Sequence, residues 1–239
     1  MTAKIFAFRN TYKKGLVIEN KANSNVAEII LYGAIGANPW DESSISAKQF
    51  SEELKKIPSN VTEIHLRINS PGGSVFDGMT MYERLKQHKA KVITYVDGYA
   101  ASIASVIALA GDEIRMGEGS FFMIHKPLTM TWGNADEHDR TIAILDKIEE
   151  QMISIYAKKS GLSRAEIANL LREETYFNAE ETLKHGFADQ IIDVGDRVSA
   201  VASMFKGNPL LKNAPEIKST IEKQKLIEMK DKINKFLAR

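Results

Sequence analysis

Short apolar runs alternate with longer amphipathic stretches along most of this chain, and this alternation predicts strands followed by helices. Strands are expected at Ala27–Tyr32, Glu63–Asn69, Lys91–Asp97, Glu113–Met116 and Phe121–Ile124. Turns are expected where glycine follows two of these runs, at Ser70-Pro71-Gly72-Gly73 and at Gly98-Tyr99. The repeated pattern indicates a sheet whose strands are linked by helices.

Apolar positions three and four residues apart predict the helices. The first helix is expected to be capped by Ser43 or Ser44. Its apolar side consists of Ile45, Phe50, Leu54 and Ile57. Further helices are expected near Val75–His88, at Ala101–Ala110 and near Asp136–Lys159. Strand–helix–strand units with short connections favour parallel strands and right-handed crossovers, so the predicted fold class is α/β.

The two ends of the chain differ from this body, which is taken as residues 26–204. Residues 1–25 show little periodicity and are expected to form an arm or a short hairpin. Residues 205–239 contain nine Lys and Arg against four Asp and Glu, a charge of +5. Their apolar residues Leu226, Met229, Ile233 and Leu237 recur at helical spacing. We therefore expect a linker and a basic amphipathic helical tail that packs on the body or on a neighbouring subunit.

Composition narrows the possible chemistry. The chain has no cysteine, which excludes a thiol nucleophile, a disulfide framework and a thiolate metal site. Its net charge of +1 gives no reason to expect nucleic acid as a partner. No stretch approaches the ~20 apolar residues that cross a bilayer, and the N-terminus lacks the apolar run of a signal peptide. A cytoplasmic protein without a membrane partner is therefore expected.

Ser102 is the first candidate nucleophile. It lies in Gly98-Tyr99-Ala100-Ala101-Ser102-Ile103-Ala104-Ser105, where a glycine precedes a helix of small and apolar residues. A hydroxyl in the first helical turn lies among free backbone N–H groups and near the positive end of the helix dipole. That setting favours a developing oxyanion. From these eight residues alone, a serine that caps a buried helix is the simpler interpretation.

Gly72 and Gly73 add a second feature. Two glycines after a strand and a proline let the backbone approach a ligand closely with its N–H groups exposed. Such donors can form an oxyanion hole, in which one lost donor typically costs ~10²–10³ in turnover. A plain turn from strand to helix uses the same residues, so the pair is weak evidence by itself.

His125 is the candidate base. It follows the apolar run Phe121–Ile124 and precedes Lys126-Pro127, so it lies where a buried element meets a loop. The separation of 23 residues from Ser102 is compatible with convergence at one edge of the sheet. A lone histidine at a strand end is more often structural. A catalytic base of this type also needs a carboxylate, and the sequence offers Glu173, Glu174, Asp189 and Asp193 without choosing among them.

Four motifs in order resemble the Clp protease proteolytic subunits, the ClpP family. They are Ile68–Gly73, Gly98–Ser102, Met123–Pro127 and Glu174–Glu181, the last leading to Gly186-Phe187-Ala188-Asp189. The resemblance runs from about Ala27 to Asp193. More narrowly, the chain looks like the ClpP-like head-maturation proteases of tailed phages. It implies a crotonase-like spiral of ββα units and a serine endopeptidase.

The resemblance also implies roles for individual residues. Ser102 matches the family's nucleophile and His125 its base. Glu174 stands where the family usually has an aspartate, so the acid is one methylene longer here. The N–H groups of Gly73 and Ile103 match the oxyanion donors. A substrate peptide is expected to bind in extended form beside Gly72, Ser74, Val75, Lys126 and Pro127.

The resemblance implies the partners as well. It suggests polypeptide substrates and a homo-oligomeric ring of about seven subunits, with the helix at Asp136–Lys159 in subunit contacts. No metal or other cofactor is needed for the reaction. A Clp ATPase unfoldase is one possible partner. The N-terminal segment and the basic tail differ from housekeeping ClpP and favour phage capsid or scaffold proteins as substrates.

Three alternatives stay open. A crotonase acting on acyl-CoA thioesters would share the fold but would not need Ser102 and His125. A serine–lysine peptidase would need Lys91 or Lys126 as a buried base with a depressed pKa, and neither is in an apolar setting. A catalytically silent assembly subunit would be consistent with the glutamate at position 174.

Overall fold

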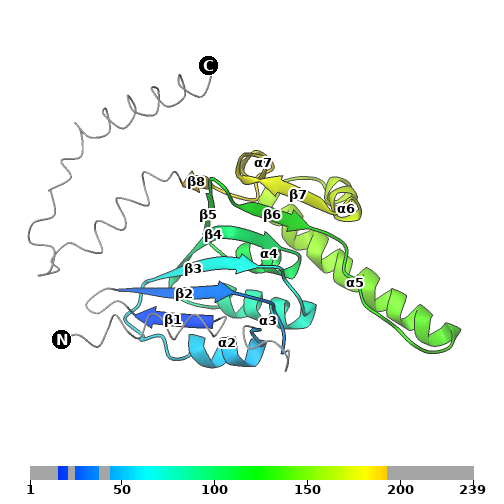
Figure 1. The fold of residues 1–239 in the computed structure, drawn as a ribbon, viewed down its shortest axis with the longest axis horizontal. Coiled ribbons are helices and arrows are strands. Elements are labelled where there is room, and N and C mark those ends of the chain that lie inside the picture. Colours follow the sequence, from blue (N-terminus) through cyan, green and yellow to red (C-terminus); the bar gives the residue numbers. More distant parts are fainter. Residues whose placement is uncertain (1–15, 21–24, 38–43, 193–239) are drawn as a thin grey trace, which may run out of the picture. The chain divides into compact units, whose positions relative to one another are not determined.

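The computed structural model describes residues 16–20, 25–37 and 44–192. They build an eight-stranded sheet in the order β1-β2-β3-β4-β5-β8, with β6 paired to β4 and β7 paired to β6 (Figure 1). The strands are β1 (Leu16–Asn20), β2 (Val26–Tyr32), β3 (Glu63–Ser70), β4 (Lys91–Ala101), β5 (Glu113–Gly117), β6 (Phe121–Ile124), β7 (Thr175–Asn178) and β8 (Gln190–Ile192). The predicted strands at β2, β3, β5 and β6 are therefore confirmed, within a residue or so at each end.

The strand directions are mixed. Five pairs of strands are parallel, as expected from the crossover connections: β2–β3, β3–β4, β4–β5, β4–β6 and β5–β8. The β1–β2 and β6–β7 pairs are antiparallel. The expectation of parallel strands is thus incomplete, because β1 and β7 join the sheet as antiparallel partners at its margins.

The prediction of a turn at Gly98-Tyr99 is wrong. Strand β4 continues through both residues to Ala101, because a second partner takes over its hydrogen bonding. Its first half pairs with β5, whereas Tyr99–Ala101 pairs with β6. The following helix, α4, is consequently shorter than predicted and spans Ile103–Ala108, with Ser102 as its N-cap.

The remaining helices are α2 (Ala47–Leu54), α3 (Val75–Lys86), α5 (Ala135–Ser160), α6 (Arg164–Arg172) and α7 (Ala179–Lys184). The predicted cap of α2 is wrong. The helix is capped by Ser46, not by Ser43 or Ser44. The Ser46 hydroxyl accepts from the backbone N–H of Gln49, and the Gln49 side chain accepts from the backbone N–H of Ser46. The long helix α5 agrees with its prediction. Helices α6 and α7 were not predicted.

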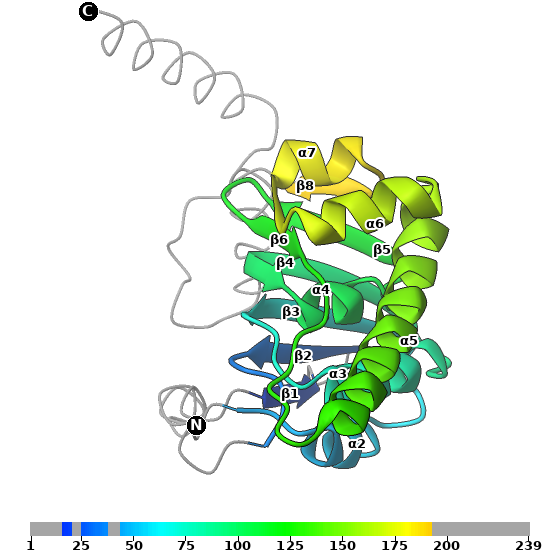
Figure 2. The same cartoon turned by 90° about the vertical axis from the view of Figure 1, so that its right-hand side faces the viewer.

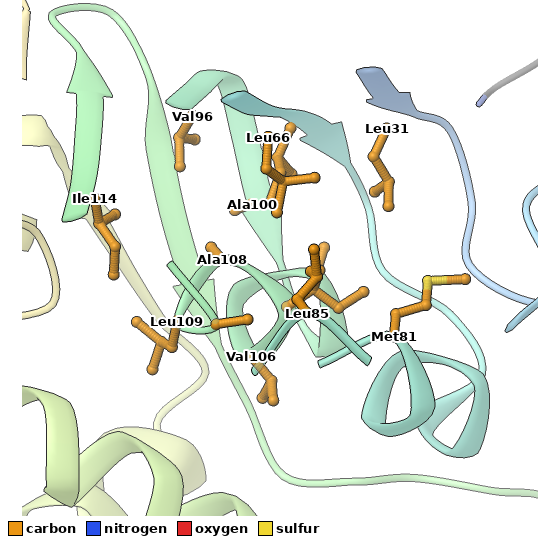
Figure 3. Close-up of a cluster of buried hydrophobic side chains, with 14 of the residues drawn as sticks. Leu31, Leu66, Met81, Leu85, Val96, Ala100, Val106, Ala108, Leu109 and Ile114 are labelled. Atoms are coloured by element: carbon orange, nitrogen blue, oxygen red, sulfur yellow. The ribbon is translucent and has the colours of Figure 1, made fainter. Parts of the chain in front are cut away.

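Helices α2, α3 and α4 lie on one side of the sheet, and α5 runs along them and extends beyond the sheet (Figures 1 and 2). The core fills the space between the sheet and these helices, where Leu66, Met81, Leu85 and Val106 meet (Figure 3). Every residue of α4 is buried. The helix that follows Ser102 is therefore fixed on all sides by core packing.

The opposite face of the sheet is polar. Arg67 donates to both carboxylate oxygens of Asp97, and the Tyr32 hydroxyl also donates to Asp97 at 2.7 Å. Burial, together with the Asp97 carboxylate, raises the pKa of Tyr32 to about 12. On this face, Tyr32, Arg67 and Asp97 thus form a hydrogen-bonded polar cluster across β2, β3 and β4. The proposed basic tail at 205–239 lies outside the described residues.

Candidate active site

Ser102 and His125 form the centre of the candidate site. The Ser102 Oγ and the His125 Nε2 are 2.7 Å apart, a hydrogen-bond distance. The sheet brings them together, because Ala101 pairs with Met123 across β4 and β6 and the Ser102 N–H donates to the Met123 carbonyl at 2.9 Å. Each side chain directly follows the end of one of these paired strands. The convergence expected at one edge of the sheet is present.

The backbone of Ser102 is strained. Its φ of 55° and ψ of −129° lie outside the regions that side-chain-bearing residues prefer, at a cost of about 1–3 kcal/mol. Although Ser102 occupies the N-cap position of α4, its hydroxyl makes no capping hydrogen bond. The hydroxyl is directed to His125 instead. The strained backbone therefore belongs to the residue that carries the candidate nucleophile.

Gly72 lies directly against the nucleophile. Its φ is 85°, and a Cβ at this position would lie 2.7 Å from the Ser102 Cβ and 2.6 Å from the Ala101 carbonyl oxygen. Gly73 has a φ of 144°, and its neighbours Gly72 and Ser74 are hydrogen-bonded to Ile35, so that a Cβ on Gly73 would lie 2.1 Å from the Ile35 carbonyl oxygen. Glycine is therefore required at both positions by contact as well as by conformation.

Two backbone N–H groups near Ser102 are free to bind an oxyanion. Neither the Gly73 N–H nor the Ile103 N–H donates a hydrogen bond to another group in the described part of the chain. The Ile103 N–H is free because the first N–H groups of a helix have no partner within it. A Cβ on Gly72 would lie 3.1 Å from the Ile103 nitrogen, which shows how closely the glycine turn approaches α4.

Glu174 lies near His125 but is not bonded to it. Strands β6 and β7 pair Ile124 with Thr175, and His125 and Glu174 are the residues next to this pair in the chain. Glu174 is exposed, with a φ of 50°, and no hydrogen bond joins its carboxylate to any described residue. Its position suits the third member of a triad, while the contact itself is not formed.

The other carboxylate candidates are placed less well. Asp189 is bound elsewhere, since it accepts from Lys159 at 2.7 Å and from the Ile114 N–H at 2.7 Å. Glu173 is exposed at the C-cap of α6. Asp193 lies outside the described residues. Among the three carboxylates that the structure describes, Glu174 lies next to the strand pair that ends at His125.

The comparisons with known proteins agree with this geometry. The model of the Clp protease family, described as "Clp protease", matches residues 43–195, which include every residue of the candidate site. The chain belongs to the Clp protease family. It is accordingly a ClpP-family serine peptidase, with the mixed α/β fold of that family.

The individual relatives are similar to this chain at moderate sequence identity. The "ATP-dependent Clp protease proteolytic subunits" of Streptococcus pyogenes serotypes M5 and M1 are each 31% identical over 183 residues, 75% of this chain and 82% of theirs. The solved structure of a mutant ClpP1 from Listeria monocytogenes is similar in fold, with a TM-score of 0.60. At 24% identity it covers 69% of this chain and 90% of its own.

Family membership and geometry together argue against two of the alternative enzyme classes. A crotonase-type thioester enzyme has no use for the bonded pair of Ser102 and His125. A serine–lysine peptidase would need a buried lysine. Lys91 and Lys126 are both exposed, and they pair with Glu113 at 3.0 Å and with Glu149 at 2.9 Å. Neither lysine is placed as the base in this Clp-family chain.

The residues expected to bind substrate lie on both sides of Ser102. Ser74 caps α3 and donates to Asp77, so its hydroxyl is already used, while Val75 is half-buried at the helix start. Lys126 and Pro127 follow His125, and the Lys126 N–H donates to the Leu171 carbonyl. A cavity of about 370 Å³ opens beside Val75, lined mainly by apolar side chains of α3 and α5.

The segment after Pro127 is exposed and apolar. Leu128, Met130 and Trp132 have exposed fractions of 72%, 97% and 98%, and every second residue is apolar. An exposed segment of this kind is accessible to a peptide. Within the described residues, no helix is long and apolar enough to cross a membrane, and no three His, Asp or Glu side chains cluster as metal ligands would.

Helix α6 is the part of the site that the sequence interpretation missed. The Leu171 carbonyl at its end accepts from Lys126, and its C-terminus leads directly to Glu174. A signal was present: Ser163 is followed three residues later by Glu166, a capping box, and Ile167 and Leu171 then recur at helical spacing.

Proposed function

We propose that this chain is a serine endopeptidase in which Ser102 is the nucleophile, His125 the general base and Glu174 the acid that orients the histidine. The observation that carries the proposal is the 2.7 Å distance between the Ser102 Oγ and the His125 Nε2 in a chain of the Clp protease family. The strained backbone of Ser102 and the adjacent free N–H groups support the same roles.

The reaction follows from these positions. His125 takes the proton of Ser102 as the serine oxygen attacks the scissile carbonyl. The negative charge on the carbonyl oxygen is stabilised by the N–H groups of Gly73 and Ile103. The protonated His125 then donates to the leaving amine, which leaves an acyl-enzyme on Ser102. Water activated by His125 hydrolyses this ester and restores the free enzyme.

Glu174 enters this mechanism when its side chain turns toward His125. The pairing of Ile124 with Thr175, which makes His125 and Glu174 neighbours across β6 and β7, supports this role. A carboxylate bonded to the Nδ1–H holds the tautomer in which Nε2 can accept the serine proton, and it stabilises the imidazolium that forms. The exposed side chain is free to make this rotamer change.

Substrate peptide binds as an extended strand between the turn at Gly72–Val75 and the segment that begins at Lys126. Backbone groups on both sides supply hydrogen bonds that do not depend on sequence, and the apolar cavity beside Val75 accepts a substrate side chain. The proposed preference is therefore for an apolar residue near the cleaved bond.

The names of the relatives support a homo-oligomeric ring that works with an ATPase unfoldase, since the curated Streptococcus pyogenes proteins are proteolytic subunits of ATP-dependent Clp protease. A head-maturation role in a phage is the second candidate. It is favoured by the basic segment 205–239 and by an N-terminal segment unlike that of housekeeping ClpP. Its substrates would be capsid or scaffold proteins.

Peptide hydrolysis tests the proposal. The full chain is incubated with a fluorogenic peptide and with unfolded casein, beside Ser102→Ala, His125→Ala and the control Ser120→Ala, which removes a buried serine hydroxyl outside the candidate site. We expect hydrolysis in the wild type and the control, and a loss of at least about 10³-fold in the two site variants. Unchanged hydrolysis in Ser102→Ala would contradict the assignment.

Stimulation of casein cleavage by a Clp ATPase would favour the unfoldase partnership over the phage role.

A further inference from the structure

Two buried hydroxyls lie beneath Ser102, and the proposed mechanism does not use them. Ser105, on α4, is fully buried, and so is Tyr156, on α5. The Ser105 Oγ is 2.7 Å from the Tyr156 hydroxyl and donates to the Ser102 carbonyl oxygen. A chain of two hydrogen bonds therefore connects the long helix α5 with the backbone of the nucleophile.

The donor and acceptor roles in these two hydrogen bonds follow from the group at their end, the Ser102 carbonyl. The Ser102 carbonyl has no proton, so the single proton of the Ser105 hydroxyl is directed to it. Tyr156 must then be the donor to Ser105. Burial raises the pKa of Tyr156 well above its ordinary value, so the phenol keeps the proton that it donates. The Ser102 carbonyl accepts from the Ser105 N–H as well, at 3.0 Å.

The Ser102 carbonyl shares a peptide plane with the Ile103 N–H. Because the peptide bond is planar and trans, the C=O and the N–H point in opposite directions and turn together. A hydrogen bond that holds the carbonyl therefore also sets the direction of the N–H. The strained φ and ψ of Ser102 make this restraint consequential, since the plane would otherwise relax toward a preferred conformation.

We propose that Ser105 and Tyr156 are a positioning pair that holds the Ser102–Ile103 peptide plane so that the Ile103 N–H points at the oxyanion. The inference rests on the proposed function, in which Ile103 is one of two oxyanion donors. It adds two residues that do not touch the substrate and that act through the backbone of the nucleophile.

The position of Tyr156 is itself fixed by aromatic packing. Its ring packs edge-on against Phe187 with centroids 6.0 Å apart, and Phe187 stacks on Phe122 at 5.4 Å. Phe122 precedes Met123, whose carbonyl accepts from the Ser102 N–H. The same aromatic cluster thus supports both peptide groups that flank Ser102, one through β6 and one through Tyr156.

Ser105→Ala and Tyr156→Phe test the inference, separately and together. A positioning role for an oxyanion donor predicts lower kcat with unchanged KM, because the interaction forms only in the transition state. We expect kcat to fall about tenfold in Ser105→Ala and about threefold in Tyr156→Phe. The double variant should match Ser105→Ala, since both changes break one chain. The inhibition constant of a peptide boronate, whose tetrahedral adduct with Ser102 resembles the transition state, should rise by the same factors.

Two matched controls separate positioning from loss of a buried hydroxyl. The Ser120 hydroxyl donates to the Gly117 carbonyl, and its N–H donates there too, which is the same local geometry away from the site. Tyr82→Phe removes a partly buried phenol hydroxyl for which no hydrogen bond is found in the described part of the chain. We expect both controls to keep wild-type kcat and boronate affinity.

The outcomes distinguish a failure of the positioning role from a failure of the proposed function. A kcat within twofold of wild type in Ser105→Ala, or an equal loss in Ser120→Ala, overturns the positioning role and leaves the proposed function intact. So does a loss that appears in KM alone. If Ser105→Ala does not fold, as judged by its thermal unfolding, the volume-matched Tyr156→Phe decides by the same criteria. A wild-type chain that neither hydrolyses peptide nor binds the boronate overturns the proposed function, and the inference with it.

Discussion

The two sides of the candidate site differ in how they are held. Ser102 lies between the end of β4 and a helix whose residues are all buried, and hydrogen bonds fix the peptide group on each side of it. Glu174 and the segment from Leu128 to Trp132 lie on the surface. Ser102 is thus held by buried contacts on both sides, whereas Glu174 and the segment from Leu128 to Trp132 are exposed.

This difference indicates which part of the chemistry is preorganised. The nucleophile and the oxyanion donors need a fixed geometry, because a displacement of about 1 Å can cost ~10² in rate. In the proposed function, by contrast, Glu174 engages His125 by a rotamer change, and the exposed segment gains contacts when it binds a partner. A bound substrate strand and a neighbouring subunit of the proposed ring are both able to supply those contacts. Substitutions on either side of the candidate site can therefore test this difference.

Among the substitutions that test this comparison, the one at the glycine turn should have the largest effect. Gly72→Ala places a methyl group 2.7 Å from the Ser102 Cβ at a φ of 85°, so either the serine or the turn must move. We expect kcat/KM for a fluorogenic peptide to fall by about 10²-fold or more. Gly119→Ala is the matched control, because no atom lies within 4 Å of its added Cβ. Activity of Gly72→Ala within threefold of the control would show that the nucleophile side is not rigid.

Substitution of the acid should have a smaller effect. Because Glu174 is exposed and not yet bonded to His125, its removal costs less than loss of a buried orienting carboxylate, and we expect about a tenfold fall in kcat for Glu174→Gln. Glu174→Asp, which restores the usual residue of the family, should keep most of the activity. Glu173→Gln is the control. Equal kcat in Glu174→Gln and the control would remove Glu174 from the triad.

The smallest effect is expected in the exposed segment. Trp132→Ser removes a side chain that is 98% exposed, so the free energy of unfolding should change by less than about 0.5 kcal/mol. If the segment binds peptide, KM should rise about threefold with kcat unchanged. Phe187→Ala, in the buried aromatic cluster, should by contrast lower the unfolding free energy by about 3–5 kcal/mol. A marked loss of stability in Trp132→Ser, measured by denaturant titration, would contradict the distinction between the two sides.

The sequence was informative where structure is decided locally. Apolar runs bounded by breakers located β2, β3 and β6, because burial of consecutive apolar residues does not depend on which strand lies next to them. The continuation of β4 past Gly98 could not be predicted in this way. It depends on pairing with β6, a strand about twenty residues further along the chain, which no local pattern reports.

The candidate site shows the same division. Their neighbouring residues made Ser102 and His125 candidates, the family resemblance implied their roles, and the structure brings them to hydrogen-bond distance. The positive φ of Ser102 was not predictable, because it is imposed by packing around α4 and by the β4–β6 hydrogen bonds. The side-chain orientation of Glu174 also escapes the sequence, since an exposed glutamate has several rotamers of similar energy.

Active-site labelling is the most direct test of the central claim, that Ser102 is a nucleophile activated by His125. The full chain is incubated with a fluorophosphonate probe, and the modified residue is mapped by mass spectrometry beside Ser102→Ala, His125→Ala and Ser120→Ala. The account predicts labelling at Ser102 in the wild type and in Ser120→Ala, and none in the other two variants. Labelling at another residue, or labelling that persists in His125→Ala at the wild-type rate, would contradict it.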